Sequence, residues 1–440
     1  MVIEGFTTDS RRVVRGELFI ALQGERFDGA AFADASLERG ASGVMVPTGT
    51  AVTAGDAAVI DADDTLLALQ RLGQHVRRMS GAKVVAITGS AGKTSTKEAT
   101  ATFLEERYTV YRTAGNLNNH IGLPLSLLEL RSRPDVAVVE LGMNHAGEIS
   151  RLVELAEPDV RVWTNVGDAH IGQFASADAI ADAKAEILEG AGPSTRLVAN
   201  ADDPRVMARV ASFPGQTTTF GLGPNADIRA TDVRDLGVSG TEARVDTPAG
   251  SASLSIRLPG RGPLMNVLAA TAVALAFDVP LEAIAARAAT LGPAPRRGEV
   301  TALPRGVTVV DDSYNSSPSA LALALDALGA DRPRGRRVAV LGEMRELGDF
   351  ADALHTESGR RAASAGVDVL VTVGGAPARA MADAALAAGM GESAVSWFET
   401  SAEAAPAVAA LLAPGDVVLV KGSRGTRTDI IVDRVKEVWG

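Results

Sequence analysis

The sequence predicts an α/β protein with three domains, on the basis of three observations. The chain has 440 residues, too many for one ordinary hydrophobic core and, at a typical domain length, enough for roughly three domains. Short β-branched segments alternate with longer alanine-rich segments, as strands and helices do around a parallel sheet. A glycine-rich segment with a lysine, GSAGKT, follows one of these predicted strands and precedes a predicted helix.

The composition narrows the class of protein. Apolar residues make up 46% of the chain and aromatic residues 4%, which is typical of a soluble globular protein packed with small side chains. The net charge of −11 argues against a nucleic-acid binder, so an anionic small molecule would need a local basic site. The absence of cysteine excludes disulfides and thiolate chemistry. Without a signal core or a long apolar run, we expect a cytoplasmic protein that does not insert into membranes. We also expect a monomer.

The central domain is expected over residues 81–294, built on a parallel sheet of the phosphate-loop type. Its predicted strands include VVAITG, VAVVELG, VRVWTNVG and RLVAN, and the stretches between them read as helices. Ligands of such sheets bind at the carboxyl ends of the strands, where Gly89 to Thr94, Glu140 and the Asp168 to His170 segment occur. Residues 217–259 show short alternating segments, which predict an antiparallel appendage, and a helix follows from Asn266.

Two further domains flank the central one. The α/β alternation resumes after a segment rich in Pro, Gly and Arg, LGPAPRRGEV, which we interpret as a hinge at about 293–299. Residues 295–440 are therefore expected to form a second, Rossmann-like sheet domain. Residues 1–80 are expected to form a smaller α/β domain.

The segment VVAITGSAGKTSTKEAT carries the strongest chemical signal. A phosphate loop is usually written G-x-x-x-x-G-K-[ST], and here Ile87 occupies the first glycine position. In the strand-to-helix context, backbone N–H groups and the helix dipole converge on an anion, with Lys93 on the outer phosphates and Thr94 on Mg²⁺. The alternative is a tight strand–helix turn with a solvated lysine.

Three other residues draw attention by their position, and each has a plain structural alternative. Glu140 is one carboxylate at the end of an apolar strand, and its alternative is an exposed strand end. His170 also follows a strand and could simply be packed or solvated, and Lys184 would ordinarily be a solvated helical lysine. Their order on successive elements of one sheet would bring them to one edge together with Thr94, where hard oxygen ligands suit Mg²⁺.

The chain resembles the Mur ligases of peptidoglycan synthesis over nearly its whole length. The segments that carry the resemblance are TGSAGKTST, TAGNLNNHIGLPLSLL, VVELGMNHAGEIS, TNVGDAHIGQFAS, AKAEI, ANADDP, VVDDSYNSSPSAL, LGEMRELG and KGSRGTR, in this order. The loop of this family is written T-G-[TS]-x-G-K-T, so Ile87 departs from the general pattern but not from the family's own. The N-terminal segment TTDSRRVVRGELFIALQGERFDG is similar to the family's UDP-sugar-binding region.

The resemblance implies site residues in all three domains. It implies a phosphate cradle and ATP contacts from Gly89, Ser90, Ala91, Gly92, Lys93, Thr94, Ser95, Asn200, Asp203, Asn266, Arg297 and Asp312. It implies two Mg²⁺ ions and a carbamylated lysine, with the metal side formed by Thr94, Glu140, His170 and Lys184, and catalytic roles for Lys93, His170 and Lys184. It implies substrate contacts from Asp9, Ser10, Arg11, Asp28, Asn116, Asn118, Asn119, Tyr314 and Asn315.

Three positions depart from the family pattern. Gly262 stands where a histidine is common, Arg296 replaces the glycine of a G-R pair, and Ser317 replaces an asparagine of N-A-N-P. Purely structural roles, without ligand contacts, also stay open for several of these residues. Asparagines such as Asn119 stabilise turns, and Asp311 and Asp312 could form a helix N-cap region. The Asp9 to Arg11 triplet could be a surface turn.

The resemblance implies an ATP-dependent amide ligase that works through an acyl phosphate. The segment DDSYNSSP favours the branch that adds D-alanyl-D-alanine to a UDP-N-acetylmuramoyl-tripeptide, with the C-terminal domain binding the dipeptide and closing over ATP. The alternatives are another Mur ligase, a folylpolyglutamate-type ligase, a phosphate-loop NTPase that switches a partner, or a nucleotide-binding scaffold. The identity of the third peptide residue, lysine or diaminopimelate, is not encoded in any of these segments.

Overall fold

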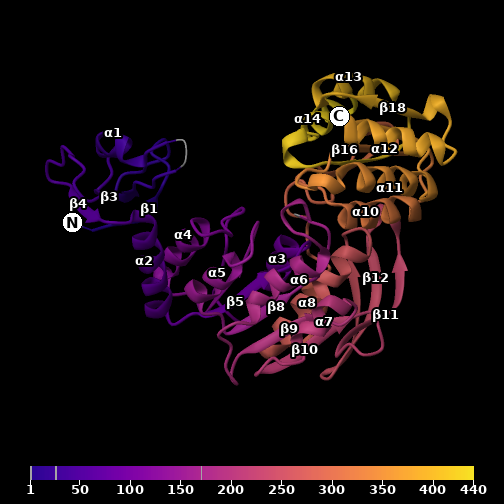
Figure 1. Cartoon of the computed structure of the whole chain (residues 1–440). Coiled ribbons are helices and arrows are strands. Elements are labelled where there is room, and N and C mark those ends of the chain that lie inside the picture. The colour runs from indigo at the N-terminus through magenta and orange to yellow at the C-terminus, as the bar shows by residue number, and fades with distance from the viewer. Residues whose placement is uncertain (1, 25–26, 170) are drawn as a thin grey trace. The chain divides into compact units, whose positions relative to one another are not determined.

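The computed structural model describes residues 2–24, 27–169 and 171–440, which form three sheets in succession along the chain (Figure 1). The sheets have four, nine and six strands. This confirms the expected α/β class with three domains. The chain divides into two compact units, the first reaching to Ala86 and adding Tyr108–Met143 and Glu148–Asp159, and the second comprising Ile87–Arg107, Asn144–Gly147 and Val160–Gly440. The domain limits at 81 and 295 stay a prediction.

The N-terminal sheet is wholly parallel and covered on both faces. Its strands run in the order β1 (Gly5–Thr7), β2 (Glu17–Ile20), β3 (Gly43–Pro47) and β4 (Ala58–Ala62). Because side chains alternate along a strand, Phe19 packs in a cluster with Ala33 of α1 (Ala33–Glu38), while Leu18 and Ile20 pack with Leu69 of α2 (Thr65–Ser80). Helix α2 begins where the Asp64 side chain accepts a hydrogen bond from Leu67 N at 2.9 Å.

The central sheet holds the predicted phosphate loop. Its strand order is β13-β12-β11-β10-β9-β8-β5-β7-β6. The strands are β5 (Lys83–Thr88), β6 (Val110–Arg112), β7 (Val136–Glu140), β8 (Val160–Trp163), β9 (Arg196–Asn200), β10 (Gln216–Gly221), β11 (Ile228–Asp235), β12 (Thr241–Thr247) and β13 (Gly250–Ile256). The helices are α3 (Lys93–Leu104), α4 (Gly122–Leu128), α5 (Glu148–Ala156), α6 (Ala177–Ala185), α7 (Pro204–Val210), α8 (Arg261–Ala276) and α9 (Leu281–Ala288).

The packing of helix α8 explains why its sequence is apolar on all sides of the helix. It packs against α3 on one side and against strands β9, β10 and β11 on another, so that Leu264, Val267 and Leu268 are all buried. It begins at Arg261, before the expected Asn266, because Pro263 is tolerated in a first helical turn. Gly262 therefore lies in the first turn of α8.

The expected antiparallel appendage is an extension of the central sheet. Strands β11, β12 and β13 pair antiparallel, as the sequence predicts. The expectation is wrong for the start of the segment, because β10 pairs parallel with β9 and β11 joins β10 in parallel through only two residue pairs. The short alternating pattern is the same for a strand of either direction, so it does not reveal which neighbour a strand will have.

The C-terminal sheet has the order β14-β15-β19-β16-β17-β18. Strand β14 pairs antiparallel with β15, and the other neighbouring strands are parallel. The strands are β14 (Glu299–Ala302), β15 (Thr308–Asp312), β16 (Arg337–Gly342), β17 (Val369–Val373), β18 (Val395–Phe398) and β19 (Val417–Lys421). The helices are α10 (Pro318–Ala330), α11 (Ala351–Ser364), α12 (Ala376–Ala387), α13 (Ser401–Leu411) and α14 (Asp429–Trp439).

The expected hinge lies in a stretch without helix or strand, between the end of α9 at Ala288 and the start of β14 at Glu299. Within it, Arg296 has φ 61° and Gly298 has φ 76°. A non-glycine residue in the left-handed region is uncommon, and here Arg296 donates a hydrogen bond to Asp429 at 2.9 Å. The backbone is thus sharply bent at this point, while motion about it stays a prediction.

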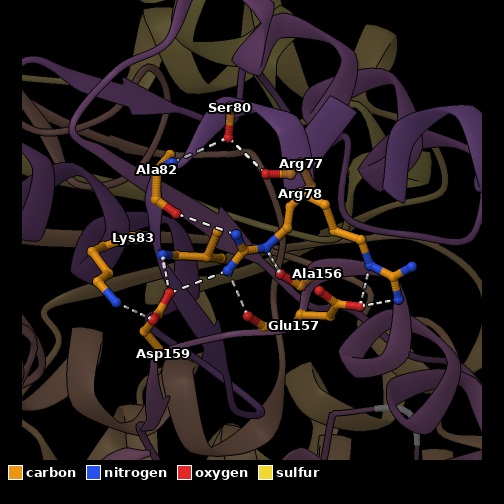
Figure 2. A network of polar contacts seen from close by, with 9 residues as sticks. Arg77, Arg78, Ser80, Ala82, Lys83, Ala156, Glu157 and Asp159 are labelled. Atoms are coloured by element: carbon orange, nitrogen blue, oxygen red, sulfur yellow. Dashed lines mark hydrogen bonds and ion pairs between the residues drawn. The ribbon is translucent and has the colours of Figure 1, made fainter. Parts of the chain in front are cut away.

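A network of charged side chains ties α2 to the segment after α5 (Figure 2). Arg77 donates to the carbonyl oxygens of Ala156 and Glu157, each at 2.8 Å, and to the carboxylate of Asp159 at 3.2 Å. Asp159 also binds Lys83 Nζ at 2.8 Å and accepts a hydrogen bond from Val84 N at 2.9 Å. Arg77 therefore satisfies carbonyl groups that the end of α5 leaves without a helical partner.

Among the described helices, none is both long and apolar enough to cross a lipid bilayer.

Candidate active site

The phosphate loop has a backbone that only glycine fits at two positions. Gly89 has φ 151° and Gly92, the N-cap of α3, has φ 82°. A Cβ atom added to Gly89 would stand 1.9 Å from Thr164 Oγ1, and one added to Gly92 would stand 2.2 Å from Asn266 Oδ1. Both the conformation and the close neighbours therefore exclude a side chain at these two positions.

The residues that follow β8 hold this loop in place. Ala91 N donates to Asn165 Oδ1 at 2.9 Å, and Asn165 Nδ2 donates to Ala91 O at 3.1 Å. Thr164 Oγ1 donates to Ala91 O at 2.8 Å, and Ser90 Oγ donates to Gly167 O at 3.1 Å. Sequence reasoning missed Thr164 and Asn165, although two polar residues directly after a buried strand, in TNVGD, were a usable signal.

Lys93 opens helix α3 and bends back over the loop. Its Nζ atom donates to Gly89 O at 2.7 Å, which places the ammonium group at the helix N-terminus beside the loop's own backbone. Thr94 and Ser95 follow in the first turn of α3, a helix of 12 residues. A cation and a helix N-terminus at one point form an anion site of the kind that phosphate groups occupy.

Lys184, on α6, is a buried amine close to the charge of Lys93. Its exposed fraction is only 2%. Burial, followed by repulsion from the Lys93 ammonium, holds the pKa of Lys184 well below the usual 10.5. The structure therefore excludes the solvated lysine that the sequence pattern alone left open, and favours an uncharged amine.

Arg161, on β8, anchors the segment that follows Lys184. Its guanidinium donates to Ile187 O and, at 2.6 Å, to Glu189 O, while its exposed fraction is 3%. The arginine thus fixes the end of α6 to the strand beside the phosphate loop. Sequence reasoning missed it, because one arginine inside VRVW gives no sign of the carbonyl groups it will meet.

Glu140 lies at the end of β7 and is 1% exposed. Asn118 Nδ2 donates to Glu140 Oε2 at 3.4 Å. The surface-exposed alternative for Glu140 is therefore wrong. Glu140 belongs to one compact unit and Thr94 to the other, so the shared Mg²⁺ site expected for them stays a prediction.

The three asparagines before α4 have different environments. Asn119 Oδ1 accepts from Gly122 N at 2.8 Å and from Ile121 N at 3.2 Å, so its side chain stabilises the start of α4. Asn118 also binds Gly142 through its backbone carbonyl at 2.8 Å, and Asn116 is exposed. The turn-stabilising alternative thus describes Asn119, while the substrate contacts expected for all three stay predictions.

The residues expected near adenosine are engaged by neighbouring backbone groups. Asn200 Nδ2 donates to Thr164 O at 2.8 Å. Asp203 caps α7 through Arg205 N at 3.0 Å and also accepts from Val166 N at 2.7 Å. Asn266 lies against the phosphate loop, where its Oδ1 accepts from Thr96 Oγ1 at 3.3 Å. Their contacts with nucleotide stay predictions.

In the C-terminal domain, the expected residues pair with one another. The Arg297 guanidinium lies 4.0 Å from the centre of the Tyr314 ring, a cation–π contact. Lys421 is buried at the end of β19, and its Nζ donates to Asp312 Oδ2 at 2.7 Å and to Asn315 O at 3.0 Å. Sequence reasoning missed Lys421 as the partner of Asp312, although it begins the KGSRGTR segment that the resemblance singled out.

The D-S-R triplet of the N-terminal domain forms a closed turn. Arg11 Nε and Nη2 each donate to one carboxylate oxygen of Asp9 at 2.8 Å. The hydrogen bonds from Arg11 lower the pKa of Asp9 from 3.8 to about 2. Ser10 lies between them, half-buried, and Asp28 accepts from Ala30 N at 2.9 Å. The arginine is held by Asp9, and diphosphate binding there stays a prediction.

His170, expected at the second Mg²⁺, lies outside the described residues. Elsewhere, over residues 2–24, 27–169 and 171–440, no three or more His, Cys, Asp or Glu side chains gather into a group able to hold a metal.

Family models and solved structures match the chain from end to end. The Mur ligase catalytic-domain model matches residues 2–109, the middle-domain model matches 87–274, and the "Mur ligase, glutamate ligase domain" model matches 296–424. The UDP-N-acetylmuramoyl-tripeptide–D-alanyl-D-alanine ligase of Escherichia coli K12 is 36% identical, with 99% of this chain and 94% of that protein covered.

Two crystal structures show the same architecture. MurF from Acinetobacter baumannii has a TM-score of 0.89 and 34% identity, covering 99% of this chain and 94% of its own. MurF ligase from Thermotoga maritima, in complex with ADP, has a TM-score of 0.87 and 28% identity, covering 99% and 98%. The phosphate loop matches the family's sequence pattern, and the similarity spans all three domains, so the chain belongs to the Mur ligase family.

Proposed function

We propose that this protein is an ATP-dependent ligase that joins D-alanyl-D-alanine to UDP-N-acetylmuramoyl-tripeptide, forming the pentapeptide precursor of peptidoglycan. The observation that carries the proposal is the phosphate loop closed by Gly89, Gly92 and Lys93 in a chain 36% identical, over 99% of its length, to a ligase of that name. The protein would act as a cytoplasmic monomer on small-molecule substrates.

In the first step, the terminal carboxylate of the tripeptide attacks the γ-phosphorus of ATP. A bond forms between a carboxylate oxygen and phosphorus, the bond to the β,γ-bridging oxygen breaks, and the products are an acyl phosphate and ADP. The Lys93 ammonium and the N–H groups at the start of α3 offset the charge on the transferred group, which makes this step mainly one of positioning and electrostatics.

In the second step, the amine of D-alanyl-D-alanine attacks the activated carbonyl carbon. The new C–N bond forms, the C–O bond to phosphate breaks, and inorganic phosphate leaves as the amine loses a proton. Water would hydrolyse the acyl phosphate, so the C-terminal domain is expected to close over the site and bring Arg297 and Asp312 to ATP. The bent segment around Arg296 and Gly298 is the place where this closure would occur.

The oxygen ligands available fit magnesium. Thr94 lies one residue beyond Lys93, and Glu140 is a buried carboxylate at a strand end, so both offer the hard oxygen atoms that Mg²⁺ prefers. Mg²⁺ would neutralise phosphate charge when bound. We assign Thr94 and Glu140 to one ion and His170 to a second.

Lys184 is proposed to carry a carbamate. A neutral amine attacks CO₂ to form a C–N bond and loses a proton, which gives an anionic group with oxygen ligands. The buried position of Lys184 beside Lys93 favours the neutral amine that this reaction needs, and the product would pair with the Lys93 charge.

The test is phosphate release from ATP by the purified protein. Phosphate should appear only when UDP-N-acetylmuramoyl-tripeptide and D-alanyl-D-alanine are both present, together with a pentapeptide product detected by mass spectrometry. Tripeptides with lysine and with diaminopimelate at the third position identify which one is used. Release with neither substrate present would contradict the ligase assignment and favour an NTPase switch.

A further inference from the structure

A short turn of the central domain contacts a helix of the C-terminal domain, and we call it the docking turn: residues 235–240. It joins β11 to β12, and Gly237–Ser239 within it form one turn of 3-10 helix. Val238 N donates a hydrogen bond to Oδ1 of Asp331, the C-cap residue of α10, at 3.1 Å. Both segments belong to the same compact unit, so this contact joins the antiparallel appendage to the C-terminal domain.

The docking turn is shaped to meet this carboxylate. Asp235 Oδ1 accepts a hydrogen bond from Gly237 N at 2.9 Å, which holds the turn while Val238 N points at α10. Gly237 has φ 62°, and a Cβ atom there would overlap Asp331 Oδ1 and stand 2.9 Å from Asp331 Cα. The left-handed backbone and the close approach of α10 both require glycine at this position.

Asp331 stands where its own helix disfavours a negative charge. The carbonyl groups at the end of a helix carry partial negative charge, which repels a carboxylate. Arg332 offsets part of this charge, because its guanidinium donates to Gly329 O and to Asp331 O, each at 3.0 Å. The carboxylate therefore gains from its partner in the other domain, the Val238 N–H group, what its own helix does not provide.

The middle of α10 lies against the start of α8, where glycines allow a close approach. A Cβ atom added to Gly260, the N-cap of α8, would stand 3.0 Å from Ala327 Cβ. Gly262, at the position where the family commonly has a histidine, faces Leu323, which remains 42% exposed. The packing at this point leaves apolar surface uncovered, and such an interface between domains does not by itself prevent motion.

The start of α10 lies beside the phosphate loop. Gly167 stands between the two, because a Cβ atom added to it would lie 2.7 Å from Ser319 Oγ of α10 and 3.6 Å from Ser90 Cβ of the loop. Ser90 Oγ also donates to Gly167 O at 3.1 Å. The segment before α10, residues 312–315, holds residues expected at ATP and substrate, so the placement of α10 decides where they lie relative to the loop.

We propose that Asp331 is a positioning residue that binds the docking turn and thereby holds the start of α10 beside the phosphate loop, an inference that rests on the proposed function. The helix is then supported at its end by Asp331 and at its start by Ser319. It is 13 residues long, about 20 Å, so Asp331 acts through α10 and not on the reacting atoms. The antiparallel appendage is the platform on which α10 docks.

The first measurement is the coupling between ATP use and ligation in the wild type, Asp331→Ala and Asp331→Asn, with phosphate and pentapeptide counted in the same reaction. Loss of the contact leaves the acyl phosphate open to water, which attacks it and returns the tripeptide carboxylate and phosphate. We expect Asp331→Ala to release more phosphate than pentapeptide and to lower kcat about tenfold. Asp331→Asn keeps an oxygen acceptor and should keep the ratio near the wild-type value.

The second measurement is hydrogen exchange, followed by mass spectrometry, on a peptide that covers the docking turn. The Val238 N–H group should exchange faster in Asp331→Ala than in the wild type, because it has lost its acceptor. A non-hydrolysable ATP analogue together with UDP-N-acetylmuramoyl-tripeptide should slow its exchange in the wild type. Faster exchange with these ligands would mean that the contact belongs to the arrangement before closure, which would overturn the proposal.

Two further variants complete the experiment. Asp326→Ala removes a carboxylate of the same helix that binds Arg361 of the same domain at 2.7 Å, and it should keep the wild-type coupling and exchange. Gly237→Ala places a methyl group against Asp331 Oδ1 and should reproduce the loss of coupling, so it serves as the test if Asp331→Ala fails to fold. Thermal denaturation shows whether each variant is folded.

The outcomes separate this inference from the proposed function. Wild-type protein that forms no pentapeptide refutes the proposed function and this inference with it. A ligase in which Asp331→Ala exchanges faster at the docking turn but keeps its coupling and kcat refutes the inference alone. Unchanged exchange in Asp331→Ala, or an equal loss of coupling in Asp326→Ala, would overturn it as well.

Discussion

At the scale of single residues, Lys184 shows how position changes the chemistry of a side chain. A helical lysine is normally charged and solvated, but this one is 2% exposed and lies near a second lysine. Burial makes the charged amine costly, and the pKa falls so that the neutral form persists below the usual 10.5. Neutrality is the condition for reaction with CO₂.

Replacing Lys184 with Ala should lower kcat about 10- to 100-fold, because an anionic group that orients the metal side is lost. Small carboxylates added to the assay should restore part of the activity. ¹³C NMR with labelled bicarbonate should show a carbamate signal in the wild type and in Lys436→Ala, a lysine change on α14, but not in Lys184→Ala. Full activity without rescue would contradict the carbamate assignment.

The lowered pKa of Lys184 predicts that the ligase activity depends on pH. Because the pKa of Lys184 is lowered, the amine stays neutral well below pH 10.5 and is protonated only as the pH falls through its lowered value. The carbamate signal and the ligase activity should therefore disappear together on the acid side. Bicarbonate added at higher concentration should shift the loss of both carbamate signal and activity to lower pH. A carbamate signal that persists in acid while the activity disappears would show that the activity does not depend on the carbamate alone.

At the scale of elements, α2 and the end of α5 are joined by Gln74, Arg77 and Arg78 of α2, and Arg77 is the more buried of the two arginines. Arg77 has a side chain only 12% exposed and donates to three backbone carbonyl groups, those of Ala82, Ala156 and Glu157, and to one carboxylate (Figure 2). Hydrogen bonds from a charged donor contribute more than neutral ones, and a carbonyl group that loses its partner inside the protein keeps the desolvation cost. The network therefore stabilises the junction between the N-terminal helix and the start of the central sheet.

Replacing Arg77 with Met should lower the free energy of unfolding by about 2–3 kcal/mol. The measurement is urea denaturation followed by circular dichroism. Arg78→Met is the matched control, since that side chain is 59% exposed and, among the described residues, binds Glu157 alone, so the change should be clearly smaller. Equal losses in the two variants would contradict the role assigned to the buried carbonyl contacts.

At the scale of the whole molecule, catalysis is expected to need motion of the C-terminal domain about residues 293–299. This segment has no regular structure, and Arg296 and Gly298 bend it in the left-handed region. Arginine residues also make the segment a trypsin target.

Cleavage by trypsin after Arg296 and Arg297 should slow when ATP and UDP-N-acetylmuramoyl-tripeptide are added together, because a closed domain arrangement restrains the segment. Peptide mapping by mass spectrometry measures the rate at each bond. Cleavage after the exposed Arg334, in the loop before β16 and outside the predicted substrate contacts, serves as an internal control for trypsin activity. An unchanged rate at the hinge under ligating conditions would contradict closure at this point.

The sequence was sufficient for the features that depend on local pattern. The alternation of strands and helices predicted the α/β class and a second sheet domain at the C-terminal end, and GSAGKT after a buried strand predicted the phosphate loop. It misjudged β10, whose parallel partner β9 is chosen by packing that a short alternating segment does not encode. Thr164 and Asn165 escaped notice because their hydrogen bonds to the loop join residues more than 70 positions apart.

What the sequence by itself determined is the glycine and lysine pattern of the loop, the order of the domains and the segments that mark the family. What only the tertiary structure decided is the state of side chains whose neighbours are distant in the chain. The pKa of Lys184 is lowered because folding buries it near Lys93, and Lys421 meets Asp312 across adjacent strands. Burial and charge are set by proximity in space, which residue order alone does not specify.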